Sequence, residues 1–259
     1  MIDPTAFIAP GTVLDTTQFD TYELVLGWSY DSRNRALFAD RGMRHTLSLS
    51  YTLPFSDVEF YTVNYDYLQF LPLTKWFTVL NSFELGYGFD IGDTTSIPPY
   101  RRFFGGGPES VRGFRESRLG PKDSFGNPYG GNLKVANQLE LLLPMPDKWR
   151  NSARFSVFFD AGNVFSTDSV TFVGRDGVTP VDYDFSLDDI KYSTGIAVQW
   201  LAPLGVFRFS YAIPLNAYRG DDVLFPDEGH GFARPVNSIA FNAAAENFLS
   251  GCLGGRAEP

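Results

Sequence analysis

Apolar and polar side chains alternate along much of the chain with a period of two. This is the period of a β-strand, in which successive side chains point to opposite faces. In the segment 205–213, for example, Phe207, Phe209, Tyr211 and Ile213 alternate with polar or small residues. The alternation predicts eight strands, at residues 22–30, 44–53, 58–70, 76–89, 132–143, 154–160, 191–201 and 205–213.

The predicted strands are about 7 to 14 residues long, which is long for globular proteins and suits membrane-spanning strands. One face of each strand is apolar and often aromatic, and the other is polar. The polar face includes Glu84, Lys134, Glu140, Asp160 and Arg208. Periodicity alone does not say which face points outward. A soluble β-sandwich or lipocalin-like barrel would bury the apolar face, whereas strand length, aromatic density and long loops favour a membrane barrel.

The lengths of the connections add a second argument for a membrane barrel. In an up-and-down antiparallel sheet, alternate connections lie at the same end. The two longest predicted connections, 90–131 and 161–190, are the fourth and the sixth, so they share an end. The connections 31–43, 71–75, 144–152 and 202–204 lie at the opposite end. Long loops at one end and tighter turns at the other are typical of outer-membrane barrels.

Composition narrows the possible functions. The chain of 259 residues contains 25 Phe and 13 Tyr, and its net charge is −9. Such an acidic chain is a poor candidate for binding nucleic acid, because few cations are available to neutralise phosphates. The one cysteine, Cys252, excludes an internal disulfide. The first residues do not resemble a signal peptide, and no apolar run predicts a transmembrane helix.

The pattern changes towards the end of the chain. Residues 1–20 are turn-rich and predict a loop. In residues 223–259, Asn237 is a suitable helix N-cap, and apolar residues recur after it at helical spacing. Gly254 and Gly255 would end that helix. We therefore expect a partial barrel over residues 1–222 and a short helical tail over residues 223–259.

The segment 103–120, FFGGGPESVRGFRESRLG, lies within the longest predicted loop. Its three consecutive glycines, Gly105 to Gly107, allow sharp turns and close packing. Arg112 carries a rigid fork of donors that suits a carboxylate, although most loop arginines are simply solvated. A phosphate-binding role is disfavoured, because no Walker-type lysine or following helix is present.

Several segments together resemble the BamA family of outer-membrane assembly factors. They are residues 27–44, the segment 103–123 with its VRGF motif, 130–146, FFDAGNVF at 158–165, and 192–216. The resemblance implies that the loop 90–131 folds back into the barrel lumen, with Val111, Arg112, Gly113 and Phe114 at its tip. It also implies that Glu140 and Asp160, on the inner wall, hold Arg112.

The resemblance implies a function without catalysis. Such a protein folds and inserts other β-barrel proteins into the outer membrane of a Gram-negative bacterium. Its clients are unfolded outer-membrane proteins, its partners are accessory lipoproteins and membrane lipids, and no cofactor or metal is implied. A seam between the first and last strands opens, and an unpaired edge templates client strands. The alternative within the same superfamily is a secretion or translocation pore.

The tail resembles a different family. The segment GHGF with His230 is similar to the carboxyl-terminal end of prolyl-oligopeptidase-family serine hydrolases, in which this histidine is the general base of a triad. No G-x-S-x-G nucleophile motif occurs in the chain, so a serine hydrolase remnant is the least favoured function. We expect residues 223–259 to be foreign to the barrel. The strand that closes the family's barrel would then be missing, as would its first strands, and we expect an open curved sheet.

Overall fold

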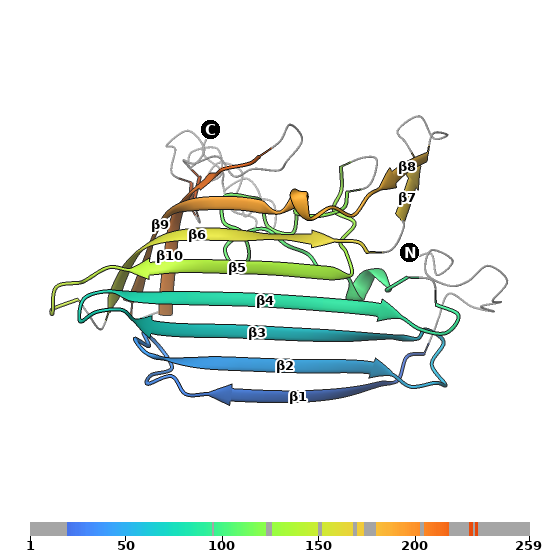
Figure 1. The fold of residues 1–259 in the computed structure, drawn as a ribbon, viewed down its shortest axis with the longest axis horizontal. Helices are drawn as coiled ribbons and strands as arrows, with labels where there is room; N and C mark the ends of the chain where they lie inside the picture. Colours follow the sequence, from blue (N-terminus) through green and yellow to red (C-terminus); the bar gives the residue numbers. More distant parts are fainter. Residues whose placement is uncertain are drawn as a thin grey trace, which may run out of the picture.

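The computed structural model describes residues 20–94, 96–122, 126–149, 152–167, 170–173, 180–202, 205–217, 228–229 and 231–232. Eight strands form one antiparallel sheet in the order β1-β2-β3-β4-β5-β6-β9-β10 (Figure 1). Their bounds are Glu23–Asp31 (β1), Gly42–Thr52 (β2), Phe60–Pro72 (β3), Thr78–Asp90 (β4), Leu133–Leu142 (β5), Ala153–Phe165 (β6), Lys191–Ala202 (β9) and Gly205–Pro214 (β10).

The remaining elements are short. Val170–Val173 (β7) pairs with Pro180–Tyr183 (β8), and Glu228–Gly229 (β11) pairs with Gly231–Phe232 (β12). Single 3₁₀ turns occur at Pro99–Arg101 (η2) and Leu187–Asp189 (η3). None of the helices in the described part of the chain is long and apolar enough to cross a membrane.

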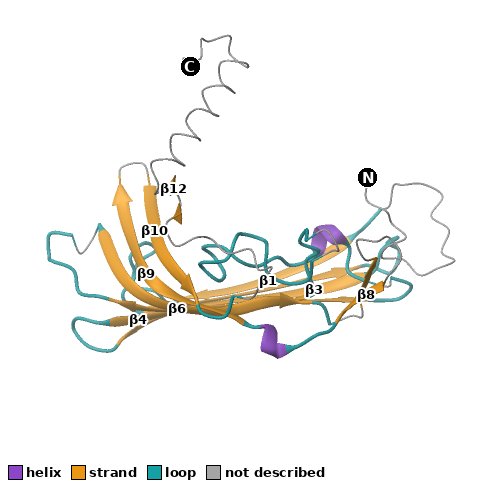
Figure 2. Cartoon of the chain, turned by 90° about the horizontal axis from the view of Figure 1, so that it is seen from above, coloured by secondary structure: helices purple, strands orange, loops and turns teal. Residues whose placement is uncertain are grey.

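The large sheet is open and curved. β1 and β10 lie at the two ends of the hydrogen-bonded order, and the sheet bends so that β9 and β10 rise from the plane of β1 to β4 (Figure 2). The prediction of an eight-stranded, open, antiparallel sheet is therefore confirmed. Adjacent strands of this sheet are consecutive in the sequence, except that β6 pairs with β5 on one side and with β9 on the other. The β7–β8 hairpin lies between β6 and β9 in the sequence.

Two sequence predictions near β6 were wrong. We expected the strand to end at Asp160, but it continues to Phe165, where it pairs with Leu133 of β5. The alternation ends there because both faces become covered: Val164 lies against Gly105 of the long loop, and Phe165 meets the ring of Phe185. The predicted loop 161–190 also contains the β7–β8 hairpin.

The apolar face of the sheet points outward. Its exposed side chains occur on most strands, and the opposite face buries polar residues such as Ser50, Gln138 and Ser193. This is the reverse of a soluble sandwich or a lipocalin-like barrel, which buries its apolar face. Examples of the exposed residues are Leu24, Leu26, Trp28, Leu47, Leu139, Val157, Phe159, Ile196, Val198, Trp200, Phe207, Phe209, Tyr211 and Ile213.

The long loops leave the sheet from one end. The connections after β4 and after β6 both start at the arrowheads on the right of Figure 1, as the loop parity predicted. The connection after β4, residues 91–132, turns back over the concave face of the sheet (Figure 2). From the opposite end, the connection 32–41 also reaches this face, where Ala39 is buried with Phe70, Leu80 and Leu142.

Two predictions fall outside the described residues. They are the loop predicted for residues 1–20, of which only residue 20 is described, and the helix predicted after Asn237 in the tail. His230, which lies between β11 and β12, is also outside the described residues.

Candidate functional site

The glycine-rich segment forms a tight turn that presents Arg112 to the sheet. Gly106 and Gly107 adopt φ angles of +98° and +85°, which side chains disfavour. The N–H of Gly107 donates to the carbonyl of Phe114 over 3.0 Å, closing the turn at its base. Val111 and Phe114 are fully buried and pack with Leu119 into a small apolar cluster. The loop tip therefore carries its own core.

Arg112 is held most closely by Asp160 of β6. Its Nε donates to Asp160 Oδ2 over 2.7 Å, and its Nη2 donates to Asp160 Oδ1 over 2.6 Å. The backbone N–H of Arg112 also donates to Asp160 Oδ2, over 3.0 Å. One carboxylate thus binds both the guanidinium fork, in the bidentate geometry that arginine favours, and the main chain of the loop.

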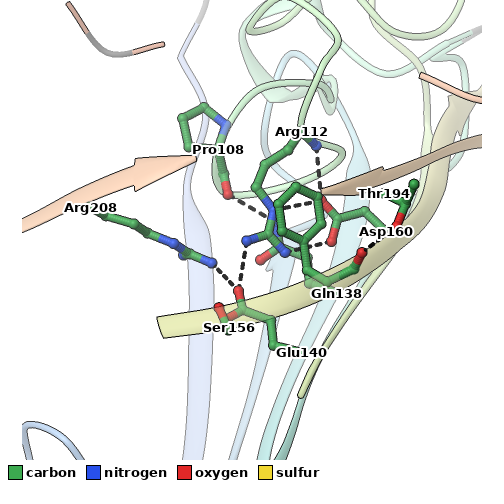
Figure 3. A network of polar contacts seen from close by, with 9 residues as sticks. Pro108, Arg112, Gln138, Glu140, Ser156, Asp160, Thr194 and Arg208 are labelled. Atoms are coloured by element: carbon green, nitrogen blue, oxygen red, sulfur yellow. Dashed lines mark hydrogen bonds and ion pairs between the residues drawn. The ribbon is translucent and has the colours of Figure 1, made fainter. Parts of the chain in front are cut away.

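Glu140 of β5 also binds the guanidinium of Arg112 (Figure 3). Arg112 Nη1 donates to Glu140 Oε1 over 2.7 Å, and Arg208 of β10 donates to the same oxygen. Ser156 donates to the other oxygen, Oε2, over 2.9 Å. The guanidinium carbon of Arg112 also lies 3.5 Å from the ring centroid of Phe158, close enough for a cation–π interaction.

We call Arg112, Glu140, Asp160 and Arg208 the Arg112 cluster. Arg112, Glu140 and Asp160 are only 2%, 1% and 0% exposed, so water does not solvate their charges. The two arginines balance the two carboxylates within the cluster. Burial alone would lower the pKa of Arg112, but the hydrogen bonds and charges of Asp160 and Glu140 outweigh it and raise the pKa above its ordinary value. Arg112 therefore stays charged.

Further contacts fix the loop against the inner wall. Gln138 of β5 donates from Nε2 to the carbonyl of Pro108 over 2.9 Å. Gly113 has a φ of +88°, and a Cβ built on it would lie 3.2 Å from the Ala212 Cβ and from Pro214 Cγ, both on β10. The tip thus spans from β5 to β10 across the concave face.

The structure brings together Arg112, Glu140 and Asp160, the three residues that the sequence had linked by resemblance. Sequence reasoning placed Arg208 on the polar face but did not link it to Glu140. It also did not assign roles to Ser156, Phe158 or Gln138. The polar-face alternation was a usable signal for Arg208, but the curvature that brings β10 over β5 has no counterpart in the sequence.

The chemistry of this site is that of an anchor. Every carboxylate oxygen of Glu140 and Asp160 already accepts at least one hydrogen bond. Within the described ranges, no group of three or more His, Cys, Asp or Glu side chains could hold a metal ion. His45 lies on β2 among aromatic rings, 2.8 Å from the Tyr65 hydroxyl. The site is built to hold a loop in one position.

Comparison with known proteins identifies relatives of the chain. A family model described as the Omp85 superfamily domain matches residues 3–242. Over 217 residues the chain is 36% identical to outer membrane protein assembly factor BamA of Neisseria meningitidis, covering 78% of this chain and 27% of that protein. The crystal structure of BamA from Haemophilus ducreyi lacking POTRA domains 1–3 matches with a TM-score of 0.67 and 31% identity, covering 78% of this chain and 40% of that chain.

The tail has a relative of its own. Over 37 residues, or 14% of this chain, it is 78% identical to dipeptidyl aminopeptidase BIII of Pseudoxanthomonas mexicana, of which the match covers 5%. The chain therefore spans less than half the length of each of these relatives.

Proposed function

Because the chain belongs to the Omp85 superfamily, we propose that it forms part of the barrel of a factor that folds and inserts β-barrel proteins into the outer membrane of a Gram-negative bacterium. The observation that carries this proposal is the Arg112 cluster, which fixes a loop inside a sheet whose outer face is apolar. An exposed apolar face of this extent suits contact with lipid chains.

The sheet edges supply the means of templating a client strand. Among the described residues, β1 and β10 each have a strand partner on one side only. An unpaired edge presents N–H and C=O groups that can pair with an incoming strand. The loop tip lies close to β10, with little room for a side chain between Gly113 and Ala212, and Arg208 of β10 donates to Glu140. The Arg112 cluster would therefore hold this edge strand in position while a client pairs with an edge.

The proposed partners follow from the proposed function. They are unfolded outer-membrane proteins as clients, lipids of the outer membrane around the apolar face, and accessory lipoproteins of an assembly complex. The work is done by backbone pairing and positioning, so we propose that the chain is not an enzyme and uses no cofactor.

A direct test measures client folding. The full chain is reconstituted into liposomes, an unfolded outer-membrane barrel protein is added, and its heat-modifiable migration is followed over time. We expect faster client folding than in empty liposomes, and no acceleration with Arg112→Ala. Equal rates in liposomes with and without the chain would reject the function. An ion conductance through the chain, without any acceleration of folding, would favour a secretion pore.

We further propose that residues 223–259 are foreign to the barrel, which would occupy residues 1–222. The support is the 37-residue similarity of the tail to a peptidase, although the family model itself extends past residue 222. His230 would then be a triad histidine without its serine. A fluorophosphonate probe should fail to label the full chain, whereas labelling would show an active serine nucleophile and overturn this interpretation.

A further inference from the structure

A cavity of about 290 Å³ lies on the inner face of the sheet, beside the Arg112 cluster. Its lining includes three arginines, from three different strands: Arg44 of β2, Arg154 of β6 and Arg208 of β10. The carboxylates in the lining are Glu140 and Glu109. The cavity therefore has many more hydrogen-bond donors than acceptors.

The strand register places part of this lining in one row. Arg154 is paired with Gln199 of β9, and Gln199 is paired with Arg208 of β10. Adjacent strands lie about 4.8 Å apart, so the three side chains stand side by side on the same face. Arg44 of β2, which lies several strands away in the sheet order, lines the same cavity.

Several of these donors have no acceptor. Among the described residues, neither the guanidinium of Arg44 nor the side-chain amide of Gln199 has a hydrogen-bond partner; both residues are half-buried, and Asp31 acts on Arg44 through its charge alone. Arg208 Nε is buried without a partner in the described part of the chain. An unsatisfied buried donor costs free energy, and buried polar groups nearly always find a partner.

The carboxylates of the lining do not supply the missing acceptors. Glu140 already accepts hydrogen bonds from Arg112, Arg208 and Ser156. The Arg112 cluster is neutral in itself. Asp31 and Asp40 also act on Arg44 and Arg154, but each is already ion-paired with another arginine, Arg33 or Arg35, so the exposed Glu109 is the remaining carboxylate in the lining. Arg154 donates to a backbone carbonyl, that of Ala39, which carries no formal charge. A positive charge and free donors remain at the cavity.

We propose that this cavity is a binding site for an oxyanion, either a carboxylate or a phosphate group. Guanidinium forks match the planar or tetrahedral oxygens of these groups and bind them in bidentate fashion. The amide of Gln199 adds a neutral donor between Arg154 and Arg208. A metal cation is disfavoured here because arginines dominate the lining. The site lies on the inner face of the sheet, and one of its arginines, Arg208, belongs to the edge strand β10.

The test uses two probes that represent the two sources of the oxyanion, citrate for carboxylates and inorganic pyrophosphate for phosphates. Binding to the full chain in dodecyl maltoside micelles is measured by isothermal titration calorimetry. We expect at least one probe to bind, and the tighter of the two identifies the source. Arg44→Gln should weaken that binding about tenfold.

Arg41→Gln is the matched control. Arg41 is an exposed arginine at the same end of the sheet and lies outside this cavity. Its substitution should change the binding affinity by no more than about twofold, well below the tenfold change, or about 1.4 kcal/mol, expected for Arg44→Gln. Gln199→Leu is a second test variant, which removes a donor without changing the charge. The proposal fails if neither probe binds, if both Arg44→Gln and Gln199→Leu bind like the unchanged chain, or if Arg41→Gln weakens binding as much as Arg44→Gln does. Retained protease protection of loop 91–132 shows that each variant is folded.

Discussion

Two loops reach the concave face of the sheet from opposite ends, and an arginine anchors each of them. In the loop 91–132, the arginine belongs to the loop, and the wall supplies the carboxylates of Glu140 and Asp160. In the loop 32–41, the arginine belongs to the wall. Arg154 of β6 donates to the carbonyl of Ala39, and its guanidinium lies 4.8 Å from the ring centroid of Phe38.

The difference between the two anchors is one of charge. The Arg112 anchor is ionic and buried, so removing Arg112 or Asp160 leaves an uncompensated charge away from water. The Arg154 anchor uses a neutral carbonyl and an aromatic ring, and either side can lose its partner at lower cost. We infer that loop 91–132 is a fixed part of the barrel interior, whereas loop 32–41 is released more easily.

The largest expected effect is that of Arg112→Ala. It leaves two buried carboxylates with only Arg208 to balance them, and breaking a buried ion pair in this way costs roughly 3–5 kcal/mol. We expect a loss of this size in urea unfolding of the micelle-bound chain, together with rapid proteolysis within residues 91–132. Arg35→Ala is the control, since its ion pair with Asp40 is exposed and worth about 0–1 kcal/mol.

The two carboxylates of the Arg112 cluster should differ in their importance. Asp160→Asn removes the negative charge and one of the two oxygens that together accept three hydrogen bonds from Arg112, so we expect a loss of stability near the low end of roughly 3–5 kcal/mol. Glu140→Gln leaves the three hydrogen bonds between Arg112 and Asp160 in place, and the partly exposed guanidinium of Arg208 can be solvated again. We therefore expect a smaller loss in the free energy of unfolding, about 1–3 kcal/mol. Urea unfolding of both variants checks the order. A larger loss in Glu140→Gln would contradict the assignment of Asp160 as the main anchor.

How far the sequence predicts these two anchors depends on the kind of partner. Arg112, Glu140 and Asp160 are ionisable residues at pattern-defined positions, so a family resemblance and the strand alternation sufficed to pair them. The partner of Arg154 is the carbonyl of Ala39, and a backbone carbonyl has no sequence signature. Loop 32–41 was therefore predicted only as a connection.

The same reasoning applies to the fold. The eight strands follow from an alternation that each strand shows over its own length, whereas the open sheet was expected from the family resemblance, which implied that the first strands and the closing strand are missing. The end of β6 was missed because Val164 and Phe165 are covered on both faces by distant segments, which removes the alternation. Sequence periodicity indicates which face of a strand is exposed. It therefore fails to predict a strand where tertiary contacts cover both of its faces.

Gly113→Ala tests how the ionic anchor is coupled to the edge strand β10. An alanine at a φ of +88° costs about 1–2 kcal/mol, and its Cβ would also press on Ala212. Gly126→Ala is a matched control, because Gly126 has a φ of +84° but no atom within 4 Å of the built Cβ. Hydrogen exchange at β10 should increase only in Gly113→Ala. An equal increase in both variants would show that the contact with β10 is unimportant.

The smallest effect is expected for Arg154→Ala, which removes the neutral anchor. The lost hydrogen bond to Ala39 and the lost cation–π contact together should cost about 1 kcal/mol. Asp40 of the same loop also attracts the guanidinium of Arg154, but its side chain is exposed and keeps its ion pair with Arg35, so no carboxylate is left buried without a partner. The consequence should be local: faster proteolysis within residues 32–41, with loop 91–132 still protected. If both loops became accessible together, the two anchors would be parts of one cooperative interior, and the contrast drawn between them would be wrong.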